Sequence, residues 1–197
     1  MRTACEQTTR WREQGVNLMR IAVNLAARQC QEPRLVQKVA DVLRKTRLDA
    51  ACLELEITEG SLIADATSTI ASLRSFREMG VRVSLDDFGT GYSSLSYLRN
   101  LPIDTLKIDQ SFVRSLNTDP SGAAITAAII AMAHILGLKV IAEGVEDELQ
   151  LAFLKERKCN EFQGYLFGKP MPARDLEELL AKRLAPRRFA LAKSTRH

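Results

Sequence analysis

The sequence contains few of the residues that build zinc sites or disulfide frameworks. Its 197 residues include four cysteines and two histidines. There is no C-x-x-C pair and no histidine cluster, and the cysteines stand far apart at Cys5, Cys30, Cys52 and Cys159. A structural zinc site is therefore not expected, and the spacing predicts free thiols in a reducing compartment.

Long apolar runs are also missing. No stretch approaches the roughly 20 apolar residues that a membrane-spanning helix needs. The first residues, Met1 to Glu6, contain no signal-peptide core. We therefore expect a cytoplasmic protein, or the cytoplasmic part of a larger one, with no membrane segment in this chain.

The chain has no strong excess of charge, since its formal net charge is +4. Residues 185–197 are predicted to form a basic, solvated tail that follows one domain at residues 1–184. The chain shows no module or aromatic pattern typical of nucleic-acid binding, so DNA is not an expected partner. The modest positive balance favours a small ligand that carries phosphate.

Strand-like and helix-like segments alternate along the chain. The apolar periodicity predicts strands at residues 20–25, 52–58, 81–86, 105–109, 139–142 and 161–166. It predicts helices at residues 3–14, 37–47, 64–79, 94–99, 123–136, 146–158 and 173–184. Repeated strand–helix order indicates parallel strands joined by right-handed crossovers. Six strands suit an open doubly wound sheet or most of a (β/α) barrel, but the Rossmann alternative lacks its G-x-G-x-x-G motif.

The alternation of residues within each strand favours the barrel. Leu53, Leu55 and Ile57 point to one face of their strand, opposite Glu54 and Glu56. Parallel strands covered by helices on both faces would be apolar almost throughout. A polar face on every strand fits a barrel interior with a site at one end. The polar residues expected to converge there are Asn24, Glu56, Asp86, Lys107, Glu143 and Gln163, with Asp87 beside them.

The central motif of the chain is a pair of adjacent acids, Asp86 and Asp87, followed by a glycine-rich loop. Burial or crowding raises the pKa of such carboxyls unless cations neutralise them. With the other converging oxygens, the pair predicts a hard site for Mg²⁺ or Mn²⁺, or else Ca²⁺. Two metals about 3.5–4 Å apart are a common device for phosphoester hydrolysis. The triplet Asp87-Phe88-Gly89 also occurs in protein kinases, but no H-R-D catalytic loop or glycine-rich nucleotide loop accompanies it.

An ordered set of motifs covers nearly the whole chain. It comprises Val23-Asn24-Leu25, ELEITE at 54–59, DDFGTGYSSL at 86–95, LKID with SFV at 106–113, AEGVE at 142–146 and QGYLF at 163–167. This set strongly resembles the EAL-domain family of bacterial cyclic di-GMP phosphodiesterases, and the ten-residue motif is highly specific. The resemblance implies a TIM-like barrel that opens cyclic di-GMP to linear pGpG with Mg²⁺ or Mn²⁺.

The resemblance also implies roles for the converging residues. The implied metal ligands are Asn24, Glu56, Asp86 and Asp87. The implied catalytic residues are Lys107, which would help to activate the attacking water, together with Glu143 and Glu59. The implied members of the substrate and water network are Gln163 and Asp109.

The loop at residues 88–95 has two further implied roles. Glu59 would hold this loop in place. In the family the loop is associated with metal binding and with dimerisation, so we expect a homodimer formed through it.

The chain departs from the family pattern in one important respect. It contains no Glu-Ala-Leu sequence, whose glutamate is a metal ligand in the family. By this alignment about six of the eight barrel strands are present, so the fold class expected is α/β with an incomplete TIM-like barrel. Three explanations stay open: a fragment of a longer product, completion by another chain, or an N-terminal helix that covers the gap. The alternative function is a catalytically impaired EAL module that binds cyclic di-GMP or a protein partner.

Overall fold

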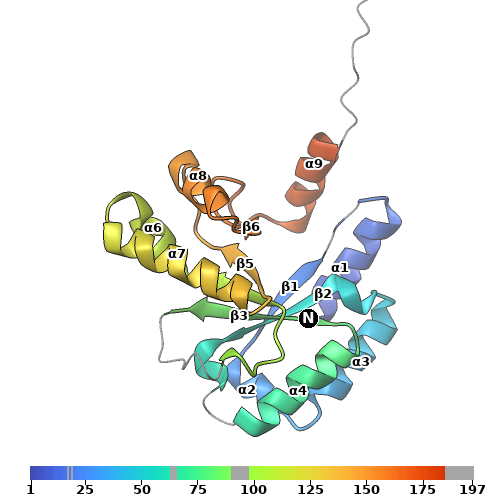
Figure 1. Cartoon of the computed structure of the whole chain (residues 1–197). Coiled ribbons are helices and arrows are strands. Elements are labelled where there is room, and N and C mark those ends of the chain that lie inside the picture. The colour runs from blue at the N-terminus through green and yellow to red at the C-terminus, as the bar shows by residue number, and fades with distance from the viewer. Residues whose placement is uncertain (17, 19, 63–65, 90–97, 185–197) are drawn as a thin grey trace, which may run out of the picture.

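Six parallel strands form one curled sheet in the computed structural model, which describes residues 1–16, 18, 20–62, 66–89 and 98–184 (Figure 1). The strands lie side by side in chain order. They are β1 (Ile21–Leu25), β2 (Leu53–Thr58), β3 (Arg82–Phe88), β4 (Thr105–Ile108), β5 (Lys139–Ala142) and β6 (Glu161–Phe162). This arrangement confirms the predicted incomplete barrel of six strands.

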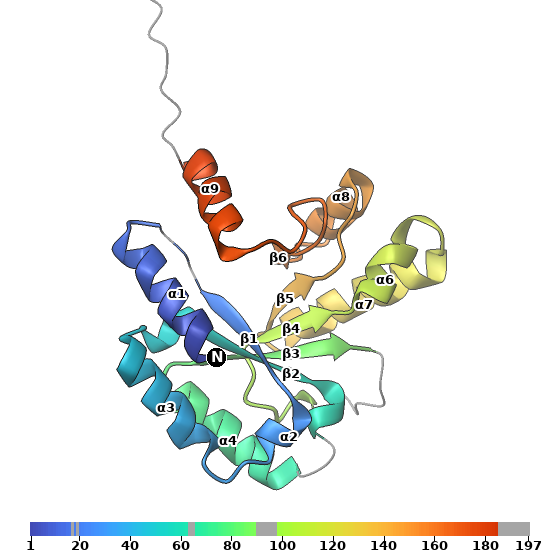
Figure 2. The same ribbon diagram turned by 180° about the vertical axis from the view of Figure 1, so that it is seen from behind.

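Most helices lie along the outside of the curl, whereas the last helix lies on its open side, between β6 and the first helix (Figure 2). The helices are α1 (Arg2–Glu13), α2 (Ala27–Cys30), α3 (Leu35–Thr46), α4 (Ala66–Glu78), α6 (Gln110–Arg114), α7 (Pro120–Ile135), α8 (Glu148–Glu156) and α9 (Ala173–Leu184). Short 3₁₀ turns are η1 (Ala50–Cys52), η2 (Glu59–Leu62) and η3 (Ser115–Asn117). Most predicted boundaries agree with these bounds to within three residues.

The core lies between the outer face of the sheet and the helices. Leu53, Leu55 and Ile57 on β2 are each 0% exposed. The amphipathic helix α3 contributes Leu35 and Val39 to the same cluster. Because each fully buried aliphatic side chain stabilises the fold by about 1.5–3 kcal/mol, this face fixes the register of the strands. The alternate residues of the same strands must then point to the inner face.

The helix α7 illustrates how the chain returns from one strand to the next. Asp119 caps its N-terminus by accepting a hydrogen bond from Ser121 N at 2.9 Å, and Pro120 occupies the first turn. Gly137 ends it with a φ of +74°, a conformation that favours glycine. The crossover therefore places β5 directly beside β4, with Leu106 opposite Val140.

The predicted strand at residues 161–166 is too long, because β6 ends at Phe162. Beyond Phe162 the chain turns and bonds to the loop after β5. Val145 N donates to Gln163 O at 3.0 Å, and Leu166 N donates to Val145 O at 3.1 Å. A Cβ on Gly164 would lie only 2.2 Å from Val145 O, so glycine permits this close approach.

Some predictions fall on residues that the structure does not describe. Most of the helix predicted at 94–99, most of the loop at 88–95, and the basic tail at 185–197 lie outside the described residues. In the part of the chain that is described, no helix has the length and apolar character needed to cross a membrane.

The cysteines confirm the prediction of free thiols, since all of them are buried and unpaired. Burial raises the pKa of the thiols of Cys5, Cys30 and Cys159, and that of Cys159 to about 11.

The thiolate is the reactive form of cysteine, so we expect no fast reaction of the folded protein with Ellman's reagent at pH 8. Four thiols should react once guanidinium unfolds the chain. A rapid reaction of any thiol in the folded protein would contradict this arrangement.

Candidate functional site

Lys107 lies at the centre of a cluster of carboxylates on the inner face of the sheet. Its ammonium nitrogen is 2.8 Å from Glu56 Oε1, 3.0 Å from Asp86 Oδ1 and 2.7 Å from Glu143 Oε1. The lysine side chain is only 3% exposed, so these oxygens take the place of its hydration shell. The structure thus brings together four of the residues that the sequence predicts to converge.

Neighbouring strands deliver these side chains to one end of the sheet. Glu56, Asp86 and Lys107 belong to the adjacent strands β2, β3 and β4. Glu143 follows β5 directly, and its N–H extends the ladder by donating to Ile108 O at 3.1 Å. All four therefore lie near the C-terminal ends of parallel strands, where α/β proteins commonly place their sites.

The cluster holds more negative than positive charge. Burial by itself would lower the pKa of Lys107, but hydrogen bonds to Glu143 and Glu56 and their charges outweigh burial and raise this pKa. Burial also raises the pKa of Glu56 and of Glu143, although Lys107 partly offsets that effect. The ammonium group of Lys107 therefore does not fully compensate Glu56 and Glu143 for their loss of water.

Asp87 joins the cluster because the strand is irregular at that point. The pairing of β3 with β4 shifts register between Leu85 and Phe88, and Asp87 has a φ of +55°. In a regular strand Asp86 and Asp87 would point to opposite faces. Here oxygens of Asp86, Asp87 and Glu143 lie within 4.8 Å of one another. Burial and the nearby charges of Asp86 and Asp109 raise the pKa of Asp87.

The three carboxylates of Asp86, Asp87 and Glu143 are suited to a divalent cation. They offer hard oxygen ligands within one ion's reach, which is the ligand type that Mg²⁺ and Mn²⁺ prefer. The raised pKa values of Asp87 and Glu143 have the same origin as a tendency to bind metal, namely burial together with nearby negative charge. The donor set therefore fits the metal chemistry expected from the sequence.

The remaining predicted residues surround this cluster at different distances. Glu59 is 3% exposed, and its Oε2 accepts a hydrogen bond from Gly89 N at 3.4 Å. Asn24 is exposed on β1, in register with Glu56. Asp109 caps α6, where its Oδ1 accepts from Ser111 N at 3.0 Å and from the Ser111 hydroxyl. Its influence on Asp87 places it near the cluster as well.

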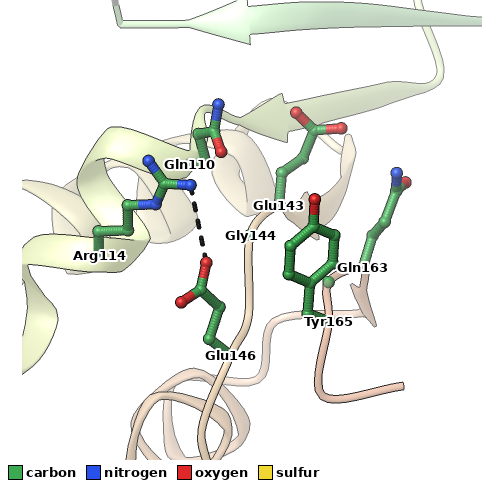
Figure 3. A pocket seen from close by; sticks show the side chains of 8 residues that line it. Gln110, Arg114, Glu143, Gly144, Glu146, Gln163 and Tyr165 are labelled. Carbon is green, nitrogen blue, oxygen red and sulfur yellow. Dashed lines mark ion pairs between the residues drawn. The ribbon is translucent and has the colours of Figure 1, made fainter. Parts of the chain in front are cut away.

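Gln163 and Glu143 line a pocket of about 220 Å³ beside the acidic cluster. Figure 3 shows their side chains and the ring of Tyr165 pointing into the same space. Across the pocket, Arg114 NH2 lies 3.6 Å from Glu146 Oε1. The pocket therefore combines a carboxylate of the acidic cluster, a half-exposed aromatic ring and a pair of opposite charges.

The sequence analysis did not predict a role for Gln110 and Arg114. The pattern that could have indicated them is their spacing of four residues at the start of a helix that directly follows Lys107 and Asp109. Such spacing puts both on one face of α6. A Cβ on Gly144 would lie 2.6 Å from Gln110 Cβ, so Gly144, with φ of +71°, allows α6 to sit against this loop.

Comparison with known proteins gives a consistent result. The model of the EAL domain family matches residues 1–170. The cyclic di-GMP phosphodiesterase NbdA of Pseudomonas aeruginosa is 47% identical over 180 residues, which are 91% of this chain and 23% of that protein. The PaMucR phosphodiesterase, solved in complex with c-di-GMP, superimposes with a TM-score of 0.85 at 45% identity, covering 89% of this chain and 71% of that one. Klebsiella pneumoniae BlrP1 with manganese and cy-diGMP gives 0.76 at 29% identity, covering 86% and 43%.

The relatives are much longer than the matched region. This chain spans about a quarter of the length of the curated relatives it matches.

Replacing Lys107 with Met should make the fold depend on metal. The variant leaves Glu56, Asp86 and Glu143 without their ammonium partner, and removing one member of a buried ion pair costs about 3–5 kcal/mol. We therefore expect a lower Tm than wild type without metal and a larger rise in Tm on adding MnCl₂. Thermal unfolding followed by circular dichroism measures both. Equal MnCl₂ shifts in the two proteins would contradict this account of the charge balance.

Proposed function

The chain belongs to the EAL domain family, and from this premise we propose that it hydrolyses cyclic di-GMP to linear pGpG with a divalent metal. The observation that carries the proposal is the cluster of Asp86, Asp87 and Glu143 with Lys107 at its centre. It supplies metal-type oxygens and a buried cation at one place. The names of NbdA and of the PaMucR complex support the choice of cyclic di-GMP as substrate.

The acidic residues would hold the metal. Asp86, Asp87 and Glu143 offer oxygens close together, and Glu56 and Asn24 lie on neighbouring strands. Mg²⁺ or Mn²⁺ is the proposed ion, and the manganese complex of BlrP1 supports that choice. A divalent cation bound there would lower the pKa of a bound water and offset charge on the phosphoryl oxygens.

Lys107 would help to activate the attacking water through its positive charge and would stabilise negative charge. Its ammonium group has three donors, and in this structure they point at Glu56, Asp86 and Glu143. Its raised pKa keeps it protonated, so it acts as a fixed positive charge rather than as a base. In the reaction, the water oxygen bonds to phosphorus, the bond from phosphorus to the 3′ oxygen breaks, and that oxygen gains a proton.

The pocket beside the cluster would receive the nucleotide. Gln163 can donate and accept hydrogen bonds, Asp109 lies near Asp87, and the Tyr165 ring is 58% exposed and available for stacking (Figure 3). Glu59 would act indirectly, because it accepts a hydrogen bond from Gly89 at the start of the loop after Asp87.

We also propose a cytoplasmic location. Its support is chemical, because unpaired cysteines suit a reducing compartment.

Turnover of cyclic di-GMP tests the main proposal. With Mn²⁺ present, we expect the chain to release pGpG, detected by liquid chromatography. Asp86→Asn removes a charge from the metal corner and should lower kcat/KM at least 100-fold. The matched control is Asp41→Asn, which changes an exposed acid on α3 that pairs with Arg44, and it should retain full activity.

The same samples distinguish the alternative function. An inactive chain that still binds cyclic di-GMP by calorimetry would contradict the enzyme proposal and favour the impaired binding module. Equal turnover by wild type and Asp86→Asn would show that the proposed cluster does not carry the reaction.

We also propose that two copies associate through residues 88–95. Support comes from the fixed start of this segment, since Gly89, with φ of +100°, sits against the Phe112 ring and is bonded to Glu59. We expect a dimer at micromolar concentration in sedimentation velocity and a monomer for Tyr92→Arg. A wild-type monomer, or an unchanged dimer in the variant, would contradict this proposal.

A further inference from the structure

Arg20 connects the two ends of the sheet. It directly precedes β1, and its guanidinium forms ion pairs with Glu54 on β2 and with Glu161 on β6. Among the described residues β1 and β6 are the first and last strands of the sheet. One side chain therefore links the two edges that curling brings toward each other (Figure 2).

The burial of this contact makes it more than a surface ion pair. Arg20 is 13% exposed and Glu54 is 1% exposed, while Glu161 is 34% exposed. Arg20 is the cation that the structure places against Glu54, and the charge of Glu54 has lost nearly all contact with water. A guanidinium group suits this task because its planar fork can meet two carboxylates in fixed directions.

The strand at the far end of this link is short. β6 consists of two residues, and its ladder with β5 pairs Glu161 with Ile141 and Phe162 with Ala142. So short an edge strand depends on contacts outside the ladder for its position. The ion pair to Arg20 is such a contact.

The link lies one layer below the candidate site. Glu54 and Glu56 are two residues apart on β2 and share its inner face, and Glu161 on β6 and Gln163 just beyond it line the same pocket as these two glutamates. A pocket of about 300 Å³ is lined by members of both layers, including Arg20. The ion pairs of Arg20 hold Glu161 near Glu54. They therefore also hold the neighbouring Gln163 near Glu56.

We propose that Arg20 is a positioning residue that clamps β6 against β1 and β2 and thereby holds Gln163 at the acidic cluster. Its effect on turnover rests on the proposed function, whereas its effect on β6 does not. Arg20 acts through Glu161 and the backbone of β6, because neither of its ion pairs involves a side chain of the acidic cluster.

The first test measures the position of β6 without using activity. Glu161→Met removes only the β6 end of the clamp and leaves Glu54 paired with Arg20. Amide hydrogen exchange followed by NMR should be at least tenfold faster at Gln163, whose N–H donates to Ala142 O at 2.8 Å. Amides of β2 should change less than twofold.

Two further variants make this test specific. Arg20→Lys keeps a charge beside Glu54 but loses the fork, so it should also speed exchange at Gln163. Arg77→Gln breaks a different arginine pair at the same end of the sheet, with Asp104 at 3.4 Å, and should leave Gln163 unchanged. Unaltered exchange at Gln163 in Glu161→Met, or equal acceleration in β2 and β6, would overturn the clamp.

The second test is a double-mutant cycle on turnover. Glu161→Met should lower kcat/KM about tenfold when Gln163 is present and less than twofold in a Gln163→Ala background, because the clamp acts through Gln163. Independent, multiplicative effects would overturn the assignment to Gln163. If no variant and no wild-type chain turns over cyclic di-GMP, the proposed function fails, and the exchange measurement still decides the clamp.

Discussion

The contact of one buried ammonium group with three carboxylates is the constraint on which the rest of the structure depends. Lys107 touches Glu56, Asp86 and Glu143 at 2.7–3.0 Å. Two unit charges about 4 Å apart interact by roughly 4 kcal/mol where the effective dielectric constant is about 20. Without Lys107 the carboxylates would repel one another by amounts of this order. With it, the cluster can form but still carries excess negative charge, which is the condition that favours a divalent cation.

The fold can hold such a cluster because the other face of each strand stabilises it. Leu55, Leu85 and Leu106 are each 0% exposed against the helices, in the same strands that carry Glu56, Asp86 and Lys107. The register of each strand is therefore fixed. A shift by one residue would move the polar side chains to the outer face, against the helices, and the leucines to the inner face. One alternating pattern therefore produces both faces of the sheet: an inner face whose crowded charges destabilise the fold and an outer face whose buried leucines stabilise it.

That pattern explains how much the sequence could predict. Alternation of Leu53, Glu54, Leu55 and Glu56 requires only a period of two, so the strands, the curled sheet and the convergence of Glu56, Lys107 and Glu143 follow from it. The resemblance assigns Asp87 to the metal site, but its place does not follow from alternation, because a regular strand would turn it away. It depends on the register shift after Leu85 and on the φ of +55° at Asp87. Neither feature can be predicted from the periodicity of the sequence.

The sequence analysis did not predict two other features, for related reasons. The shortness of β6 depends on Gly164 packing against Val145 O, a contact between two loops. The link from Arg20 to Glu161 joins residues 141 positions apart, and alternation assigns Glu54 to the inner face without showing which cation it contacts. Periodicity assigns a side chain to a face, whereas a tertiary contact also needs the curvature of the sheet.

The inner face therefore carries two charged layers with different balances. In the lower layer Arg20 forms ion pairs with Glu54 and Glu161, although Glu54 Oε1 accepts no hydrogen bond from the residues that the structure describes. In the upper layer one ammonium serves three carboxylates, and Asp87 adds a fourth beside them. The lower layer has one cation for two carboxylates and is nearer to charge balance, which suits a structural support. The upper layer has an excess of negative charge that a divalent cation would offset, so it suits a metal-dependent reactive site.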